Sequence, residues 1–363
     1  MKKLDAKLTP DCDGSPRLSD RVLKSVRSVA VAVLIATVLC LQAMVPGAQA
    51  QTIDVGNVAF TFATVEEGVE ILTTPDDFVQ RLSPFDRSAR LKTNRDVTEA
   101  EYLEFLSHNV LEWNDAEKYK IGTALNNIRD TLEAMSLPLP PTVYLVKTTG
   151  DEEGAAAYTR STAIMFPRQY VAEKSIEELQ ALIAHETFHV LSRANFNTLR
   201  NELYQIINFF PGNEITLPPQ LEQIKITNPD APINDHYIYL TITEEPLSNC
   251  GGETCEGTQY WAVPILVATS EYDPCKGGEF FDYSLLQFLL VDMVGPDTFE
   301  PIYDGDGEPQ LVGLERICDF YEQVGKNTDY IIHPEEILAE NFVKLVVPTP
   351  EILVEMTNIL GSV

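Results

Sequence analysis

The clearest periodic pattern in the chain lies at residues 175–193, where apolar positions recur on one face of a helical wheel and no Gly or Pro interrupts the run. Ser175 and Glu178 at its start fit a capping box, in which each side chain bonds to the other residue's backbone N–H. The pattern therefore predicts an amphipathic helix over residues 175–193. Its apolar stripe consists of Ile176, Leu179, Leu182, Ile183 and Leu191.

The chain before this helix divides at a Pro-rich run, residues 137–141. Residues 51–140 show helical spacing of apolar positions at 99–113 and at 119–135. We expect this stretch to form a mainly helical N-terminal subdomain, or alternatively a propeptide. A length of about 313 residues after position 50 exceeds one comfortable hydrophobic core, which favours a separate subdomain.

Three short apolar or β-branched runs, at residues 142–147, 155–158 and 163–166, lie between the Pro-rich run and the helix. They indicate strands, and the first two are joined by a turn at residues 149–154. Short strands followed by a long helix predict an α+β fold, in which the helix packs on a small mixed sheet.

The predicted helix carries the candidate chemistry, because His185, Glu186 and His189 form an H-E-x-x-H motif. Positions i and i+4 project from one helical face, so both imidazoles can reach one metal ion while Glu186 points toward its open coordination position. The chain has five histidines in 363 residues, which makes a chance match at this spacing rare. The motif predicts a zinc site with a general base beside it.

A catalytic zinc ion usually takes a third protein ligand, and the best candidate lies after residue 330. Pro334 suits the first turn of a second helix, on which Glu336 and Glu340 share a face at i and i+4. His333, just ahead of that helix, could stabilise an oxyanion or cap the helix. Three other carboxylates are rivals for the third ligand position: Glu202, Glu244 and Glu245.

An H-E-x-x-H helix followed by a helix with E-x-x-A-E resembles the gluzincin zinc metallopeptidases. The run from Glu336 to Phe342 is particularly similar to the glutamate helix of lethal-factor-type peptidases. The resemblance implies that His185 and His189 bind one Zn²⁺ per chain with Glu336, and that Glu186 is the general base. It also implies that Glu340 orients a ligand histidine. Tyr330, six residues before Glu336, corresponds to a tyrosine that assists catalysis in that group.

The resemblance implies a zincin-like catalytic domain over residues 141–363, in which one of the predicted strands lies at the edge of the cleft. An extended peptide could add to such an edge by main-chain pairing. In this chain 146 residues separate His189 from Glu336, more than in the lethal-factor type. We therefore expect an insertion at about residues 200–320 between the two motif helices.

Residues 1–50 have the features of a signal peptide, with seven basic residues before the apolar run at 29–45 and an Ala-Gln-Ala ending at 48–50. Cleavage after Ala50 would place the protein outside the cytoplasm, either secreted or periplasmic. The apolar run could instead be a retained membrane anchor, because about 17 residues can just span a bilayer.

The net charge of the chain after position 50 excludes some classes of binding partner. Without the seven basic and four acidic residues of positions 1–50, the chain keeps 19 basic and 51 acidic residues, a net charge near −32. Nucleic acid and anionic membranes are poor partners for such a surface. After signal cleavage we expect no membrane association, and the expected partner is a peptide or protein substrate.

Four cysteines remain after position 50, an even number that in an exported protein predicts two disulfides. Three pairings are possible, and the simplest joins Cys250 to Cys255 and Cys275 to Cys318. These two disulfides would stabilise the insertion that separates the two motif helices.

The sequence thus predicts an exported zinc metallopeptidase that hydrolyses peptide bonds with zinc-activated water and Glu186 as general base. Two alternatives stay open. The chain could be a non-catalytic binding protein with a zincin fold, or a zinc hydrolase that acts on non-peptide amides.

Overall fold

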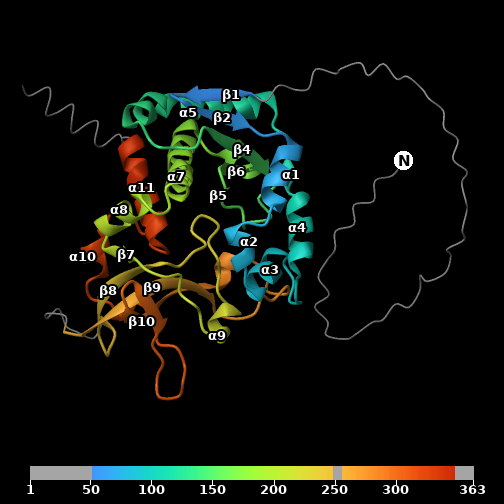
Figure 1. The fold of residues 1–363 in the computed structure, drawn as a ribbon. Helices are drawn as coiled ribbons and strands as arrows, with labels where there is room; N and C mark the ends of the chain where they lie inside the picture. Colours follow the sequence, from blue (N-terminus) through green and yellow to red (C-terminus); the bar gives the residue numbers. More distant parts are fainter. Residues whose placement is uncertain (1–50, 248–255, 348–363) are drawn as a thin grey trace, which may run out of the picture. The chain divides into compact units, whose positions relative to one another are not determined.

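Two β-sheets and the helices that pack between and around them make up the described part of the chain, residues 51–247 and 256–347 of this computed structural model (Figure 1). The fold belongs to the α+β class, as the sequence predicts. No helix within these described ranges is both long and apolar enough to span a membrane. The proposed signal segment, residues 1–50, lies outside them.

The first sheet, sheet A, is mixed and has the strand order β1-β2-β4-β6-β5, with β3 paired to the end of β4. The β2–β4 and β4–β6 pairs are parallel and the other pairs are antiparallel. This order leaves β5 at an edge of the sheet. The strands are β1 (Thr52–Val55), β2 (Val58–Phe62), β3 (Val110–Leu111), β4 (Thr142–Thr148), β5 (Tyr158–Arg160) and β6 (Ala163–Pro167).

Residues 51–140 are not a separate helical subdomain, because β1, β2 and β3 belong to the same sheet as β4 to β6. The described residues from 51 onward form one compact unit. The stretch is nevertheless rich in helix, as expected, and contains five helices. They are α1 (Val65–Thr73), α2 (Asp77–Arg81), α3 (Pro84–Arg90), α4 (Glu99–Ser107) and α5 (Asp115–Met135).

Strand β5 starts three residues later than the apolar run at 155–158 predicts. Gly154 and Ala155 both have a left-handed backbone, with φ of 56° and 68°, so the preceding turn continues into this run. The strand begins only at Tyr158 and pairs with β6 across a two-residue turn.

Helix α7 (Ile176–Ala194) is the predicted motif helix, and it follows the short helix α6 (Arg168–Glu173). Its capping box is formed, because Ser175 N donates to Glu178 over 2.7 Å and Glu178 N donates to Ser175 over 3.2 Å. α7 contacts α5, β5, β6 and the C-terminal helix α11 (Pro334–Val346) (Figure 1). Pro334 occupies the first turn of α11, as predicted.

The insertion between α7 and α11 folds into sheet B, which is antiparallel and has the order β11-β10-β9-β8-β7, with β12 paired to β10. Its strands are β7 (Phe209–Pro211), β8 (His236–Ile242), β9 (Thr258–Ala268), β10 (Ser284–Gly295), β11 (Thr298–Pro301) and β12 (Leu311–Val312). Short helical elements connect them. These are α8 (Leu199–Ile206), α9 (Pro219–Glu222), α10 (Phe320–Val324), η2 (Phe280–Tyr283) and η3 (Leu314–Arg316).

Cys275 and Cys318 in this insertion are both disulfide-bonded. Cys250 and Cys255 lie outside the described residues, so the pairing of the four cysteines stays a prediction.

One hydrophobic core joins both sheets to the helices that carry the motif. It includes Phe60 of β2, Leu125 of α5, Ile183 of α7 and Leu240 of β8, all nearly or fully buried. Phe342 of α11 packs on Phe188 of α7 with ring centroids 5.7 Å apart. The relative position of α7 and α11 therefore depends on the same core as the rest of the fold.

Replacing Phe342, which is 7% exposed, with Ala should lower the free energy of unfolding by about 3–5 kcal/mol, because a cavity would open between α11 and α7. Leu345 on the same helix is 67% exposed and provides the matched control, since Leu345→Ala should change stability by less than about 0.5 kcal/mol. Denaturant unfolding of both variants measures the difference. Equal losses would contradict the packing role of Phe342.

Candidate metal centre

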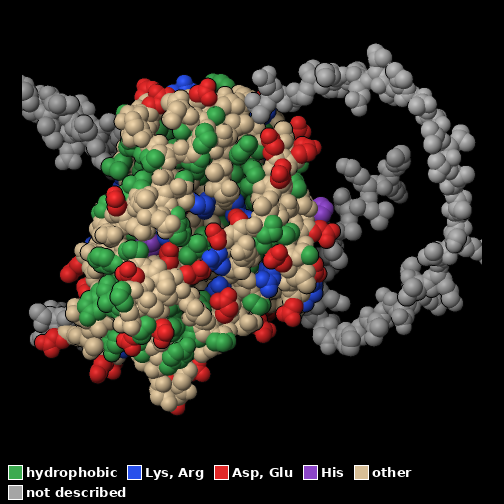
Figure 2. Space-filling model, in the orientation of Figure 1, with side chains coloured by type: hydrophobic (Ala, Val, Ile, Leu, Met, Phe, Trp, Pro, Cys, Tyr) green, Lys and Arg blue, Asp and Glu red, His purple; other side chains and the backbone are tan. Residues whose placement is uncertain are grey.

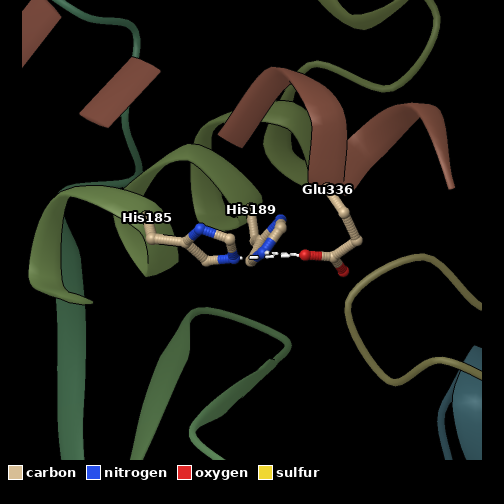
Figure 3. Close-up of side chains that lie close together, drawn as sticks. All are labelled: His185, His189 and Glu336. Carbon is tan, nitrogen blue, oxygen red and sulfur yellow. Dashed lines mark hydrogen bonds and ion pairs between the residues drawn. The ribbon is translucent and has the colours of Figure 1, made fainter. Parts of the chain in front are cut away.

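Helices α7 and α11 bring two imidazoles and one carboxylate together (Figure 3). His185 and His189 lie one turn apart on α7, with ring centroids 4.7 Å apart. Glu336, in the first turn of α11, places Oε2 3.1 Å from His185 Nε2 and 3.5 Å from His189 Nε2. One potential ligand atom from each residue thus lies within 4.8 Å of the others.

The second nitrogen of each imidazole is held by a further carboxylate. His185 Nδ1 lies 3.1 Å from Glu340, and His189 Nδ1 lies 3.0 Å from Glu335. A carboxylate accepts hydrogen bonds, so when each Nδ1 donates to its own carboxylate a neutral ring can direct its Nε2 lone pair toward a metal ion. Glu335 is fixed in turn by the hydroxyls of Ser192 and Tyr204, which both donate to it.

This arrangement fits a bound cation. In the neutral tautomer with a protonated Nδ1, two Nε2 lone pairs and one carboxylate oxygen lie within 4.8 Å of one another, as three acceptors that one cation can bridge. His189 Nε2 and Glu186 Oε2 are both buried without a hydrogen-bond partner, which is costly unless an ion or another group occupies the space between them. Two imidazole nitrogens and a carboxylate oxygen form a donor set that suits Zn²⁺ among the divalent metals.

The electrostatics of the site also favour a cation. Burial opposes charge on His185, but Glu336 and Glu340 outweigh this effect and raise the pKa of His185 to about 10. Burial likewise opposes ionisation of Glu336, yet the two histidines hold the pKa of this carboxyl well below its usual range. A pocket in which carboxylates outnumber imidazoles binds positive charge, either protons or a metal ion.

Glu186 lies beside the converging ligand atoms and is only 2% exposed. Burial, together with the nearby carboxylate of Asp230, raises the pKa of Glu186 to about 8. A carboxylate with a raised pKa takes up a proton readily, which is the property that a general base needs at neutral pH.

Tyr330 lies over the ring of His185, with centroids 6.3 Å apart and an angle of 29° between the planes. Burial and the carboxylates of Glu336 and Asp230 raise its pKa, so its hydroxyl stays protonated and can donate. The side chain is still 41% exposed. Tyr330 can therefore reach both the ligand residues and solvent.

The rival carboxylates are not part of the centre, because Glu202, Glu244 and Glu245 are all exposed and away from the cluster. His333 is the N-cap of α11, and its Nδ1 accepts a hydrogen bond from Glu335 N over 3.1 Å. Burial lowers the pKa of His333 to about 4, so the ring stays neutral and keeps this lone pair. Of its two predicted roles, the structure supports capping.

Two groups of residues at the centre have no counterpart in the sequence prediction. Glu335 is one of them, although its position next to Glu336 on α11 indicates a partner for the second histidine. Asn228 and Asp230 come from the insertion. Asn228 donates to Glu336 Oε1 over 2.6 Å, and Asp230 lies within 4.8 Å of Glu186 and His189.

Comparison with known proteins finds no relative: no protein-family model, no curated protein and no solved structure matches this chain.

Replacing Glu336 with Gln should reduce bound divalent metal from about one ion per chain to a small fraction, because the amide is a poorer ligand than the carboxylate. The amide oxygen can still accept from Asn228, so the fold should persist. Glu202→Gln is the matched control and should keep its metal. Elemental analysis of both purified variants measures the metal, and full content in Glu336→Gln would exclude Glu336 as a ligand.

Proposed function

We propose that the protein is an exported, zinc-dependent metallopeptidase of the gluzincin kind, in which His185, His189 and Glu336 hold the ion. One observation carries this proposal. Glu336 meets the Nε2 atoms of both histidines although 146 residues separate the two motifs in the sequence, and the meeting point adjoins a buried Glu186. A zinc ion bound there would polarise the substrate carbonyl and lower the pKa of a water molecule.

Glu186 is the general base in this mechanism. Its buried Oε2 has no partner and can accept the proton of the attacking water, and the same carboxyl then delivers this proton to the leaving amine. Both transfers need this carboxyl close to the attacking water, and Glu186 lies within 4.8 Å of His189.

Tyr330 is the donor to the oxyanion that develops as water attacks. Its position over the ring of His185 and its protonated hydroxyl support this role. A donor that bonds more strongly to the transition state than to the ground state accelerates the chemical step.

The substrate is an extended peptide that pairs with the edge strand β5, which lies at the end of sheet A and contacts α7.

On the face shown in Figure 2, Lys and Arg side chains gather near the middle, whereas Asp and Glu are spread over the surface. Export follows from the signal-like residues 1–50, and the acidic composition suits a soluble extracytoplasmic protein.

Glu186→Gln should keep one zinc ion per chain and lower the rate of peptide hydrolysis by roughly 10²–10⁴-fold, because the amide cannot accept the proton. The measurement compares zinc content and chelator-sensitive hydrolysis of an unfolded protein substrate in the unaltered protein and the variant. Zinc without hydrolysis in either protein would favour the non-catalytic alternative. Hydrolysis of simple amides but not of peptides would favour the non-peptide hydrolase.

Tyr330→Phe should lower kcat by about 100-fold, with a much smaller change in KM, since the hydroxyl acts mainly in the transition state. Tyr303→Phe is the matched control, because Tyr303 is an exposed tyrosine of the insertion. Steady-state kinetics on one peptide substrate test both variants, and unchanged turnover in Tyr330→Phe would remove the proposed role.

A further inference from the structure

A short segment of the insertion, residues 228–230, lies against the metal centre. Asn228 Nδ2 donates to Glu336 Oε1, the oxygen that does not face the histidines, over 2.6 Å. The carboxylate of Asp230 approaches the centre next to Glu186, with one oxygen within 4.8 Å of Glu186 and of His189 Nε2 or Nδ1. The segment thus covers the side of the ligand cluster where Glu186 lies.

Asp230 also binds the edge strand β5. Its Oδ1 accepts from the backbone N–H of Thr159 over 2.6 Å and from Thr159 Oγ1 over 2.8 Å. Because β5 is the last strand of sheet A, this N–H is the main-chain donor that an extended peptide would use to join the sheet. One side chain therefore lies close to Glu186 and His189 and binds the proposed substrate edge as well.

The segment is anchored to the motif helix by one guanidinium group. Arg193, in the last turn of α7, donates through Nη2 to the carbonyl oxygens of Pro229 and Asp230, each over 3.1 Å. Its Nη1 donates to Ser161 O in the β5–β6 turn over 3.0 Å. Arg193 thus connects the segment to α7 and to the turn that follows β5.

Polar contacts hold the segment, and apolar packing contributes little. Residues 228–235 are all half-buried, and none of them belongs to a hydrophobic core cluster. Residues 229–233 also line a cavity of about 240 Å³ that they share with Arg200 and Glu335. Water can replace each hydrogen bond when the segment moves, so displacement costs little free energy compared with opening a core element.

We propose that residues 228–230 form a built-in inhibitory segment, in which Asp230 covers the Thr159 N–H and takes the open coordination position when a metal ion is bound. This inference rests on the proposed function and adds its regulation. A catalytic zinc site keeps one coordination position open for water or substrate, and a fourth protein ligand closes it. Asp230 lies beside His189 and Glu186 but outside the group formed by His185, His189 and Glu336, so it reaches that position by a shift toward the ion. The described conformation is the closed one, and an incoming peptide must displace Asp230 from both of its contacts.

A ligand of the centre can bind only to molecules in which the segment is displaced. Its apparent affinity is therefore the intrinsic affinity multiplied by the fraction of such open molecules. Asp230→Ala removes the carboxylate and should raise the affinity for acetohydroxamate, a small zinc-binding probe, at least ten-fold, within the range of common intramolecular couplings. Asp230→Asn keeps an oxygen that can accept from Thr159 but is a poorer metal ligand, and should give a smaller increase. Asp306→Ala, in an exposed turn, is the control and should leave the affinity unchanged.

The test uses the full chain loaded with Zn²⁺ or Co²⁺, with metal content measured first. Acetohydroxamate affinity is then measured by calorimetry, and the visible spectrum of the Co²⁺ form reports the change in coordination between the unaltered protein and Asp230→Ala. Equal affinities and identical spectra would overturn the proposal, and so would loss of metal from Asp230→Ala, which would make Asp230 a structural ligand.

These outcomes are separate from the test of peptidase activity. Tighter probe binding and an altered spectrum without any hydrolysis would support the inhibitory segment while contradicting the proposed peptidase. The opposite result is also possible: the unaltered protein hydrolyses peptides, and Asp230→Ala changes neither the rate nor the probe affinity. That result would support the peptidase and overturn the proposed inhibitory role of residues 228–230.

Discussion

The contact between α7 and α11 is the constraint on which the rest of the site depends. It buries two adjacent carboxylates, Glu335 and Glu336, and buried carboxylates are costly unless they are paired. Glu335 receives hydrogen bonds from His189, Ser192 and Tyr204. This use of His189 Nδ1 directs the opposite nitrogen toward Glu336. The hydrogen bonds that allow α11 to bury its two carboxylates are therefore the same contacts that form the candidate metal site.

The remainder of the fold keeps this contact in place. α7 is fixed at its start by a formed capping box and along its length by α5 and sheet A, so the motif histidines lie on a rigid element. Sheet B shares the same hydrophobic core and returns the chain to α11. A large insertion can separate the two motif helices without weakening the site, because loop length costs stability only slowly. What the insertion adds is Asn228 and Asp230.

The two motif helices were predictable because their signals are local. The capping residues, the 3.6-residue apolar period and Pro334 at the start of α11 each act within one helix. The hairpin of β1 and β2 was missed, although Gly56 and Asn57 form a two-residue turn and the positions of β2 alternate between buried and half-buried. The alternating pattern of these two strands covers only four and five residues, so the longer helical patterns later in residues 51–140 dominated the prediction for this stretch.

The contacts of Asn228, Asp230 and Tyr204 could not be predicted in the same way. The partners of these side-chain hydrogen bonds lie 71 to 131 positions away in the sequence, and the turn-rich composition around Asp230 is typical of any loop. Only the tertiary path of the insertion brings them to the centre. A long-range polar contact leaves no periodic pattern, so a single sequence carries no signal for it.

The chemistry of residues 228–230 also explains how the segment could occupy the proposed peptidase site without being cleaved. A substrate would present a carbonyl carbon to the metal centre and main-chain groups to β5. Here the carbonyl oxygens of Pro229 and Asp230 both accept from Arg193, so they are directed to the end of α7 and not to the ligand residues. Pro229 also lacks the N–H with which a strand would pair. The segment meets the centre and the edge strand with side chains alone, and a carboxylate side chain offers no peptide bond for Glu186 to help break.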